Sequence, residues 1–263
     1  MPSLSPRFTS ADSVVAALRT AGCVFAEDEA RLILAAARTP DELVGMVDRR
    51  VTGHPLELVV GWAEFRGLRI TVGPGVFVPR RRTEFLVEQA LAQVPGASVV
   101  VDLCCGSGAV GAALAAALGP VELHAADIDP AAVDCARRNT ADAGGRAHTG
   151  DLFDALPADL RGRVDILAAN VPYVPSDEVA LLPTEARDHE PLVALDGGAD
   201  GLDILRRVAT EAPHWLARGG CLLVETSERQ ASAAVDAFTR SGLTPRLAVS
   251  EALYAHVVIG TRA

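Results

Sequence analysis

The fold is decided by residues 99–111, which read VVVDLCCGSGAVG. The apolar run at the start of this stretch predicts a buried strand, and the alanine-rich residues 107–118 predict a helix directly after it. Between them, Gly106, Gly108 and Gly111 form the pattern G-x-G-x-x-G. Such a loop is either a tight turn between a strand and a helix, or a site for a nucleotide-like ligand at the carboxyl end of the strand. The residues around the loop distinguish between these two interpretations.

Strands and helices alternate along the rest of the chain. Further strands are predicted at residues 121–126, 146–149, 164–169 and 221–225, and near Leu247 and Val257. Helices are predicted at residues 83–94, 130–139, 201–217 and 228–240. This alternation predicts an α/β fold of Rossmann-like type, in which helices cover both faces of a mostly parallel sheet. Ligands of such sheets bind at the carboxyl ends of the strands.

The first part of the chain has a different pattern. Apolar residues recur there at helical spacing, as in Val14, Val15 and Leu18. The segments WAEF and LRITV then flank Arg66-Gly67, which is typical of a β-hairpin. We therefore predict an N-terminal helical domain at residues 1–60, a β-hairpin linker at 61–82 and the α/β domain at 83–263.

Composition and charge narrow the classes of function. Apolar residues make up 49% of the chain, which is enough for a sizeable core. No apolar run approaches the roughly 18 residues that span a bilayer, and the first ten residues lack the apolar core of a secretory signal, so a cytoplasmic protein is expected. The formal net charge of -10 argues against a large nucleic-acid footprint. The five cysteines form no CxxC pair and no metal-ligand spacing with the six histidines, so reduced thiols and no metal are expected.

Two acidic residues next to the glycine loop point to the ligand. Asp102 precedes the loop, where a carboxylate repels a pyrophosphate but attracts a ligand that carries an ammonium and a sulfonium. Asp127 ends the next predicted strand, where a carboxylate accepts hydrogen bonds from ribose hydroxyls. Together they predict S-adenosyl-L-methionine rather than NAD as the cofactor. Asp151, in GDLF, lies either beside the adenine, with Leu152 packing on the ring, or at a helix cap.

The strand predicted at residues 164–169 runs into Asn170-Val171-Pro172-Tyr173. Asn and Pro are common in turns, but after the glycine loop and a ribose-binding acid this segment matches a site for a planar amide nitrogen. An amide nitrogen is a poor nucleophile, so the site must hold it in line with the methyl group, at about 3 Å, and accept its hydrogens. The Asn170 side-chain oxygen and the Val171 backbone carbonyl can each accept one N–H. Tyr173 offers a flat face to a planar substrate.

These motifs have counterparts in a known family. The segment NVPY resembles the (N/D)PPY motif of methyltransferases that act on amino or amide nitrogens. Residues 53–226 resemble, in colinear order, the protein-(glutamine-N5) methyltransferases of the HemK/PrmC type, which modify the glutamine of the Gly-Gly-Gln motif in peptide release factors. The matching segments are GHPLELVVGWAEFRGLRI, VFVPRRRTEFLVEQAL, the glycine loop, AADIDP, GDLFDAL, NVPY and EARDHEPLVALDGGADGLDI.

The resemblance implies a fold, a reaction and a set of site residues. The fold is a Rossmann-like seven-stranded class I methyltransferase domain behind a small N-terminal helical domain that recognises the substrate. The reaction moves a methyl group from S-adenosyl-L-methionine to a protein glutamine and leaves S-adenosyl-L-homocysteine, with a peptide chain release factor as the partner and no membrane or nucleic-acid substrate. The implied catalytic residues are Asn170, Val171, Pro172 and Tyr173. The implied cofactor-binding residues are Asp102, Cys104, Gly106, Gly108, Asp127, Ile128, Asp151, Leu152 and Asn170, and the substrate-side residues are Pro79, Arg80, Glu84 and Glu190.

The chain departs from the family pattern in four respects. Cys104 stands where the family's loop usually has glycine, so the backbone there is less free. Val171 replaces the first proline of NPPY but keeps its carbonyl. Arg81 and Arg82 replace the usual proline and acid, and the N-terminal helical region is shorter. These departures bear on the choice of acceptor more than on the chemistry.

Two other interpretations stay open. A methyltransferase acting on adenine N6, cytosine N4 or guanine N2 of a nucleic acid would share the cofactor and the chemistry, and the arginines at residues 80–82 would meet phosphates. The negative net charge and the lack of a further basic stripe argue against it. A binding module that has kept only the fold is opposed by the presence of Asp102, Asp127, Asn170 and Tyr173.

Overall fold

The computed structural model describes residue 8 and residues 10–263. Residues 1–7 and 9 of the predicted N-terminal region lie outside the described residues. The rest of that region is helical, as predicted. Its helices are α1 (Ala11–Thr20), α2 (Ala26–Ala36), α3 (Pro40–Val51) and α4 (Leu56–Val60).

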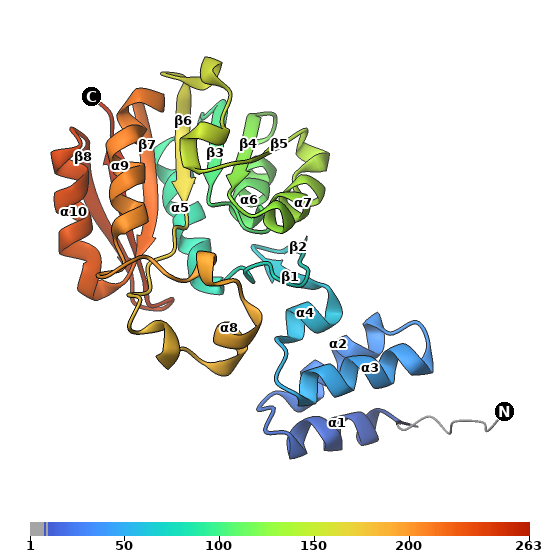
Figure 1. Ribbon diagram of the computed structural model, residues 1–263. Coiled ribbons are helices and arrows are strands. Elements are labelled where there is room, and N and C mark those ends of the chain that lie inside the picture. The colour runs from blue at the N-terminus through green and yellow to red at the C-terminus, as the bar shows by residue number, and fades with distance from the viewer. Residues whose placement is uncertain (1–7, 9) are drawn as a thin grey trace.

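The N-terminal helices begin at good capping residues and pack together. The side chains of Ser10 and Thr39 accept backbone N–H groups at the starts of α1 and α3. Leu18, Ile33 and Val47 are fully buried in a small core that belongs to these helices alone. Figure 1 shows the four helices to one side of the sheet, beyond the hairpin.

A short antiparallel hairpin connects the helices to the sheet domain. Its strands are β1 (Trp62–Phe65) and β2 (Leu68–Thr71), with Phe65 paired to Leu68. Arg66 and Gly67 both have positive φ, 49° and 75°, as a two-residue hairpin loop requires. The predicted hairpin and its turn are confirmed.

The larger part of the chain is built on a seven-stranded sheet with the order β5-β4-β3-β6-β7-β9-β8. The strands are β3 (Val99–Leu103), β4 (Glu122–Asp127), β5 (Arg146–Thr149), β6 (Val164–Ala169), β7 (Leu216–Thr226), β8 (Thr244–Ser250) and β9 (Ala255–Thr261). Strands β3 to β7 are parallel, and β9 runs antiparallel to both of its neighbours. The predicted mostly parallel sheet is therefore confirmed.

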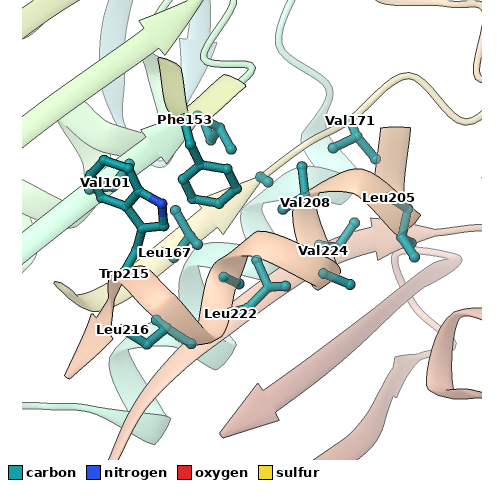
Figure 2. Packing of buried hydrophobic residues seen from close by; sticks show 14 of the residues in the cluster. Val101, Phe153, Leu167, Val171, Leu205, Val208, Trp215, Leu216, Leu222 and Val224 are labelled. Atoms are coloured by element: carbon teal, nitrogen blue, oxygen red, sulfur yellow. The ribbon is translucent and has the colours of Figure 1, made fainter. Parts of the chain in front are cut away.

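Helices cover both faces of this sheet. They are α5 (Glu84–Gln93), α6 (Ala109–Leu118), α7 (Pro130–Asn139), α9 (Asp203–Trp215) and α10 (Ala231–Arg240). Successive strand residues point to opposite faces. Val101 accordingly packs with α9 and α10, whereas Val100 packs with α5 and α6. Figure 2 shows the first of these layers, in which Trp215 lies against Phe153 with ring centroids 5.4 Å apart. Each such fully buried apolar side chain contributes roughly 1.5–3 kcal/mol to folding.

Several boundaries differ from the predictions. The helix predicted at residues 228–240 starts at Ala231, after a 3-10 turn at Glu228–Gln230, and the strand predicted at 221–225 extends over Leu216–Thr226. The helix α8 (Thr184–His189), between β6 and α9, was not predicted because six residues without a buried side chain leave no apolar periodicity. It lies beyond the carboxyl ends of the strands (Figure 1). Among the described residues, no helix is long and apolar enough to cross a membrane.

Candidate active site at the carboxyl ends of the strands

A cavity of about 670 Å³ opens at the carboxyl ends of β3, β4 and β6. It brings together residues from the glycine loop, the ends of three strands and the segment before α5. The predicted site residues in its lining are Asp102, Cys104, Gly106, Asp127, Ile128, Asp151, Leu152, Asn170, Val171, Pro172, Tyr173, Pro79, Arg80 and Glu190. Parallel strands place their carboxyl ends at one edge of the sheet, which explains this convergence.

Two predicted site residues lie outside the lining. A Cβ at Gly108 would stand 2.9 Å from the Cα and Cβ atoms of Ala136, so this glycine lets α6 start close against α7. Glu84 lies at the start of α5, and its carboxylate accepts the backbone N–H of Arg66 in the hairpin turn at 3.1 Å. The contacts of Gly108 therefore serve helix packing, and the contact of Glu84 attaches the hairpin. Contact of either residue with a ligand stays a prediction.

Asp102 is a buried carboxyl group aimed at the start of α6. Its Oδ2 atom accepts the backbone N–H of Gly111 at 2.8 Å. Burial raises the pKa of Asp102 to about 8, against the opposing effect of this hydrogen bond. A buried carboxyl group with a raised pKa lacks a compensating positive charge, and a cationic ligand group beside it would supply one.

The raised pKa of Asp102 leads to a pH prediction. In the ligand-free protein the carboxyl group is mostly protonated at neutral pH, because burial holds its pKa at about 8. A cation beside it favours the ionised form, so binding releases a proton and affinity rises by up to about tenfold per pH unit until the pH reaches that pKa. The same shift means that the ligand-free fold loses stability as the pH rises from the ordinary carboxyl range towards this pKa.

Calorimetry with S-adenosyl-L-methionine across this pH range measures the effect. In Asp102→Asn the rise should disappear. A wild-type affinity that does not change with pH would contradict the pairing of Asp102 with a ligand cation.

Asp127 ends β4 and organises the glycine loop. Its Oδ2 atom accepts the N–H of Gly106 at 2.8 Å, and its Oδ1 atom accepts the N–H of Asp129 at 3.0 Å. Burial raises the pKa of Asp127, with the two backbone hydrogen bonds acting in the opposite direction. Each carboxylate oxygen keeps a further lone pair for a ligand hydroxyl.

Cys104 lies in the loop with a left-handed backbone, at a φ of 54°. A residue other than glycine in that conformation costs about 1–2 kcal/mol. Its side chain packs, half-buried, against the core on the α9 face. Burial raises the pKa of the Cys104 thiol, so a reactive thiolate does not form near neutral pH. These contacts agree with the interpretation of Cys104 as a packing residue.

We expect Cys104→Gly to keep methyl-transfer activity and to raise the free energy of unfolding by up to about 1 kcal/mol, because it removes the left-handed strain but adds freedom to the unfolded chain. Cys104→Ala, which also lacks the thiol but keeps the strain, should be active without the gain. Denaturant unfolding and turnover measure both. Loss of activity in both variants with the fold intact would instead implicate the thiol.

Asp151 and Leu152 follow β5 at the edge of the cavity. Asp151 is the N-cap residue of the 3-10 helix Leu152–Ala155, but its side chain makes no capping hydrogen bond. Its Oδ2 atom instead accepts from Arg207 of α9 at 2.7 Å. Leu152 has a φ of 49° and lines the cavity. Contact of Asp151 with the adenine stays a prediction.

The NVPY segment continues from β6 across the cavity. Val171 is buried in the core on the α9 face. The Oδ1 atom of Asn170 is buried and has no hydrogen-bond partner among the described residues. A buried acceptor without a partner costs about 1–3 kcal/mol, which an incoming N–H donor would relieve.

Hydrogen bonds with Leu195, Gly197 and Gln230 hold the backbone where this segment ends. The N–H of Val174 donates to the Leu195 carbonyl at 3.0 Å, and the N–H of Gly197 donates to the Val174 carbonyl at 2.8 Å. Gln230 donates through Nε2 to the Tyr173 carbonyl at 2.8 Å. The segment after Pro172 is therefore held from two sides.

The arginines at residues 80–82 are mostly turned to acidic groups of the site. Arg80 donates to both carboxylate oxygens of the buried Glu190, at 2.7 and 2.6 Å. Arg82 donates through Nε to Glu225 at 3.0 Å and through Nη2 to the Tyr173 hydroxyl. Because the guanidinium groups of Arg80 and Arg82 are already paired with carboxylates, this segment offers few free positive charges to a phosphate.

Arg82 was singled out from the sequence only as a departure from the family pattern and a candidate phosphate contact, whereas Arg207 and Glu225 were missed. A signal for Glu225 was present, because it closes the apolar run CLLVE at the expected carboxyl end of a strand. Arg207 had no comparable signal, since surface arginines look the same until the partner is known.

Comparisons with known proteins show which proteins this chain is similar to. The family described as "Methyltransferase small domain" matches residues 67–182. A release factor glutamine methyltransferase of Geobacter sulfurreducens is 39% identical over 208 residues, which cover 77% of this chain and 72% of that protein. A 4-amino-L-phenylalanine/4-methylamino-L-phenylalanine methyltransferase of Streptomyces pristinaespiralis is 36% identical, over 79% of this chain and 73% of that protein. Among solved structures, a methyltransferase from Pyrococcus furiosus shares the fold with a TM-score of 0.57 at 16% identity, over 75% of this chain and 90% of that chain.

The sequence resemblance is thus confirmed over most of both chains, and the seven-stranded fold agrees with it. Together with an acidic glycine loop and NVPY at one cavity, these similarities establish that the chain belongs to the release factor glutamine methyltransferase family.

Proposed function

We propose that this enzyme transfers a methyl group from S-adenosyl-L-methionine to the side-chain amide nitrogen of a glutamine, in the Gly-Gly-Gln motif of a peptide chain release factor. The observation that carries the proposal is the buried, unpaired Oδ1 atom of Asn170 at a cavity next to the glycine loop. Membership of the family supports the same reaction.

The residues of the cavity fit the cofactor. Asp102 supplies a buried carboxyl group that a cation would ionise, and Asp127 supplies acceptors for ribose hydroxyls. Asp151 and Leu152 line the cavity on the side expected for the adenine, with Ile128 beside Asp127. When bound, S-adenosyl-L-methionine supplies the electrophilic methyl group, and S-adenosyl-L-homocysteine remains after transfer.

The acceptor amide is then oriented by this chain's own groups. The Asn170 side-chain oxygen accepts one N–H of the amide and the Val171 carbonyl accepts the other, which directs the nitrogen towards the methyl group. The Tyr173 ring lies against the planar amide. With the cofactor bound, the methyl carbon would exchange its bond to sulfur for a bond to the amide nitrogen, which would then lose a proton to water.

The same proposal assigns roles to other parts of the chain. The helices of residues 1–60 recognise the release factor, the hairpin at 61–82 links them to the catalytic domain at 83–263, and Pro79, Arg80 and Glu190 lie on the substrate side. Because release factors act on ribosomes, the proposed substrate supports a cytoplasmic location.

Mass spectrometry of a release factor incubated with the enzyme and S-adenosyl-L-methionine tests the reaction. We expect one methyl group on the glutamine of Gly-Gly-Gln and none on a release factor with that glutamine changed to glutamate. Calorimetry tests the cofactor separately. Binding of NAD without binding of S-adenosyl-L-homocysteine would refute the cofactor assignment.

A second acceptor class is favoured by the similarity to the Streptomyces pristinaespiralis enzyme, whose name specifies an aromatic amine of a free amino acid. An aniline nitrogen is planar and conjugated like an amide nitrogen, so the same two acceptors would orient it. 4-Amino-L-phenylalanine is therefore the small-molecule acceptor to compare with the release factor.

A further inference from the structure

Glu225 is a buried acidic residue that the chemistry described so far does not use. It lies near the carboxyl end of β7, next to β6 in the sheet, where Val224 pairs with Ala169 just before NVPY. Its side chain is only 2% exposed. Its Oε1 atom accepts from Arg82 Nε at 3.0 Å and from the Tyr173 hydroxyl at 3.2 Å.

Arg82, Glu225 and the Tyr173 hydroxyl all contact one another and form a triangle. Its Nη2 atom donates to the Tyr173 hydroxyl, and its guanidinium carbon lies 5.7 Å from the centre of the Tyr173 ring. The hydroxyl is therefore engaged both as donor, to Glu225, and as acceptor, from Arg82. Burial and the nearby Glu225 carboxylate raise the pKa of Tyr173, so the hydroxyl stays protonated and keeps donating.

Stability alone does not explain why a carboxylate is buried here. The second oxygen of Glu225, Oε2, is buried and has no hydrogen-bond partner among the described residues. A buried carboxylate in an ion pair is often no more stabilising than an apolar side chain of similar size, and an unsatisfied acceptor adds a further cost. The triangle does, however, fix the ring that forms one wall of the acceptor cavity.

We propose that Arg82 and Glu225 are positioning residues that hold the Tyr173 ring in the orientation needed to align a planar acceptor with the methyl group. This inference rests on the proposed function. It gives Arg82 a role at the acceptor and not at a nucleic-acid phosphate. Glu225 orients Arg82 and Tyr173 without touching the substrate.

The test compares Arg82→Met and Glu225→Leu with Glu225→Gln, which keeps an acceptor for both donors. Arg81→Met is the matched control, because Arg81 is exposed in the same segment and does not line the cavity. Turnover and KM are measured with the release factor, and the affinity for S-adenosyl-L-homocysteine by calorimetry. The chain has only two tyrosines, so ring-labelled tyrosine gives a simple NMR spectrum that Tyr254→Phe assigns.

We expect Arg82→Met and Glu225→Leu to lower kcat by about tenfold to a hundredfold, the range for a misplaced reactant, with little change in cofactor affinity. The Tyr173 ring signals should shift or broaden in both variants. Glu225→Gln should recover a large part of kcat and of the wild-type signals, and Arg81→Met should match the wild type.

Unchanged Tyr173 signals in Arg82→Met would overturn the inference, whatever the activity. So would a shift of these signals with kcat unaltered. If Arg82→Met weakened binding to a nucleic-acid duplex while the tyrosine signals stayed in place, Arg82 would be a phosphate contact instead. Failure of the proposed function is distinguishable, because the wild-type enzyme would then leave the release factor unmethylated while the NMR comparison still reports on the ring.

Discussion

Asn170→Ala is expected to lower turnover by at least about a hundredfold, the effect of misplacing a nucleophile by about 1 Å. The alanine removes the side-chain oxygen that we assign to one N–H of the acceptor amide, and this oxygen has no other partner among the described residues. Because the oxygen acts on the acceptor, the affinity for S-adenosyl-L-homocysteine should stay nearly unchanged. Single-turnover kinetics and calorimetry measure the two quantities.

Asn170→Asp is the matched control for this variant. It keeps an oxygen acceptor at the same place and should retain more activity than the alanine variant. If Asn170→Ala turned over at the wild-type rate, or lost cofactor binding in proportion to activity, the acceptor role of Asn170 would have to be abandoned.

Gly201→Ala is expected to have an effect of similar size, about a hundredfold on turnover, through the backbone of NVPY. Gly201 has a φ of 74°, and a Cβ there would stand 2.2 Å from the Tyr173 carbonyl oxygen and 2.3 Å from Gln230 Nε2. The new methyl group must push the NVPY segment away from its place and break the bond from Gln230. Turnover and the urea midpoint of unfolding measure the result.

Gly162→Ala separates this displacement from backbone strain alone. Gly162 has a φ of 73°, but a Cβ there would meet nothing within 4 Å. Both variants should lose stability by roughly 1–2 kcal/mol from the left-handed backbone. Only Gly201→Ala should lose most of its turnover. Equal turnover in the two variants would contradict the idea that the contacts at Tyr173 hold the NVPY segment in its active position.

Much of the fold could be predicted because its signals are local. The strand, glycine loop and helix around residues 99–118 follow from apolar runs and glycine spacing, and the hairpin follows from Arg66-Gly67. The places of Asp102 and Asp127 in the cavity follow from the same pattern, because parallel strands end at one edge of the sheet.

The remaining features depend on contacts between distant segments, which spacing does not encode. Arg82 and Glu225 are 143 positions apart, and only the folded sheet makes them neighbours. Gly108 fits the loop pattern as well as Gly106 does, yet its place against Ala136 becomes visible only once α6 and α7 are packed. The family resemblance covers the segment EARDHEPLVALDGGADGLDI as a whole. Which of its residues hold the NVPY segment is visible only in the backbone hydrogen bonds of the folded chain.

The central claim is that the acceptor is the glutamine amide of a release factor. The most direct test offers the same enzyme three acceptors in parallel with methyl-labelled S-adenosyl-L-methionine: a release factor with its Gly-Gly-Gln loop, a nucleic-acid duplex, and 4-amino-L-phenylalanine. We predict label on the release factor, located on that glutamine by mass spectrometry and absent from the Gln→Glu version. Label on the duplex or on the amino acid, with the release factor unmodified, would contradict the claim.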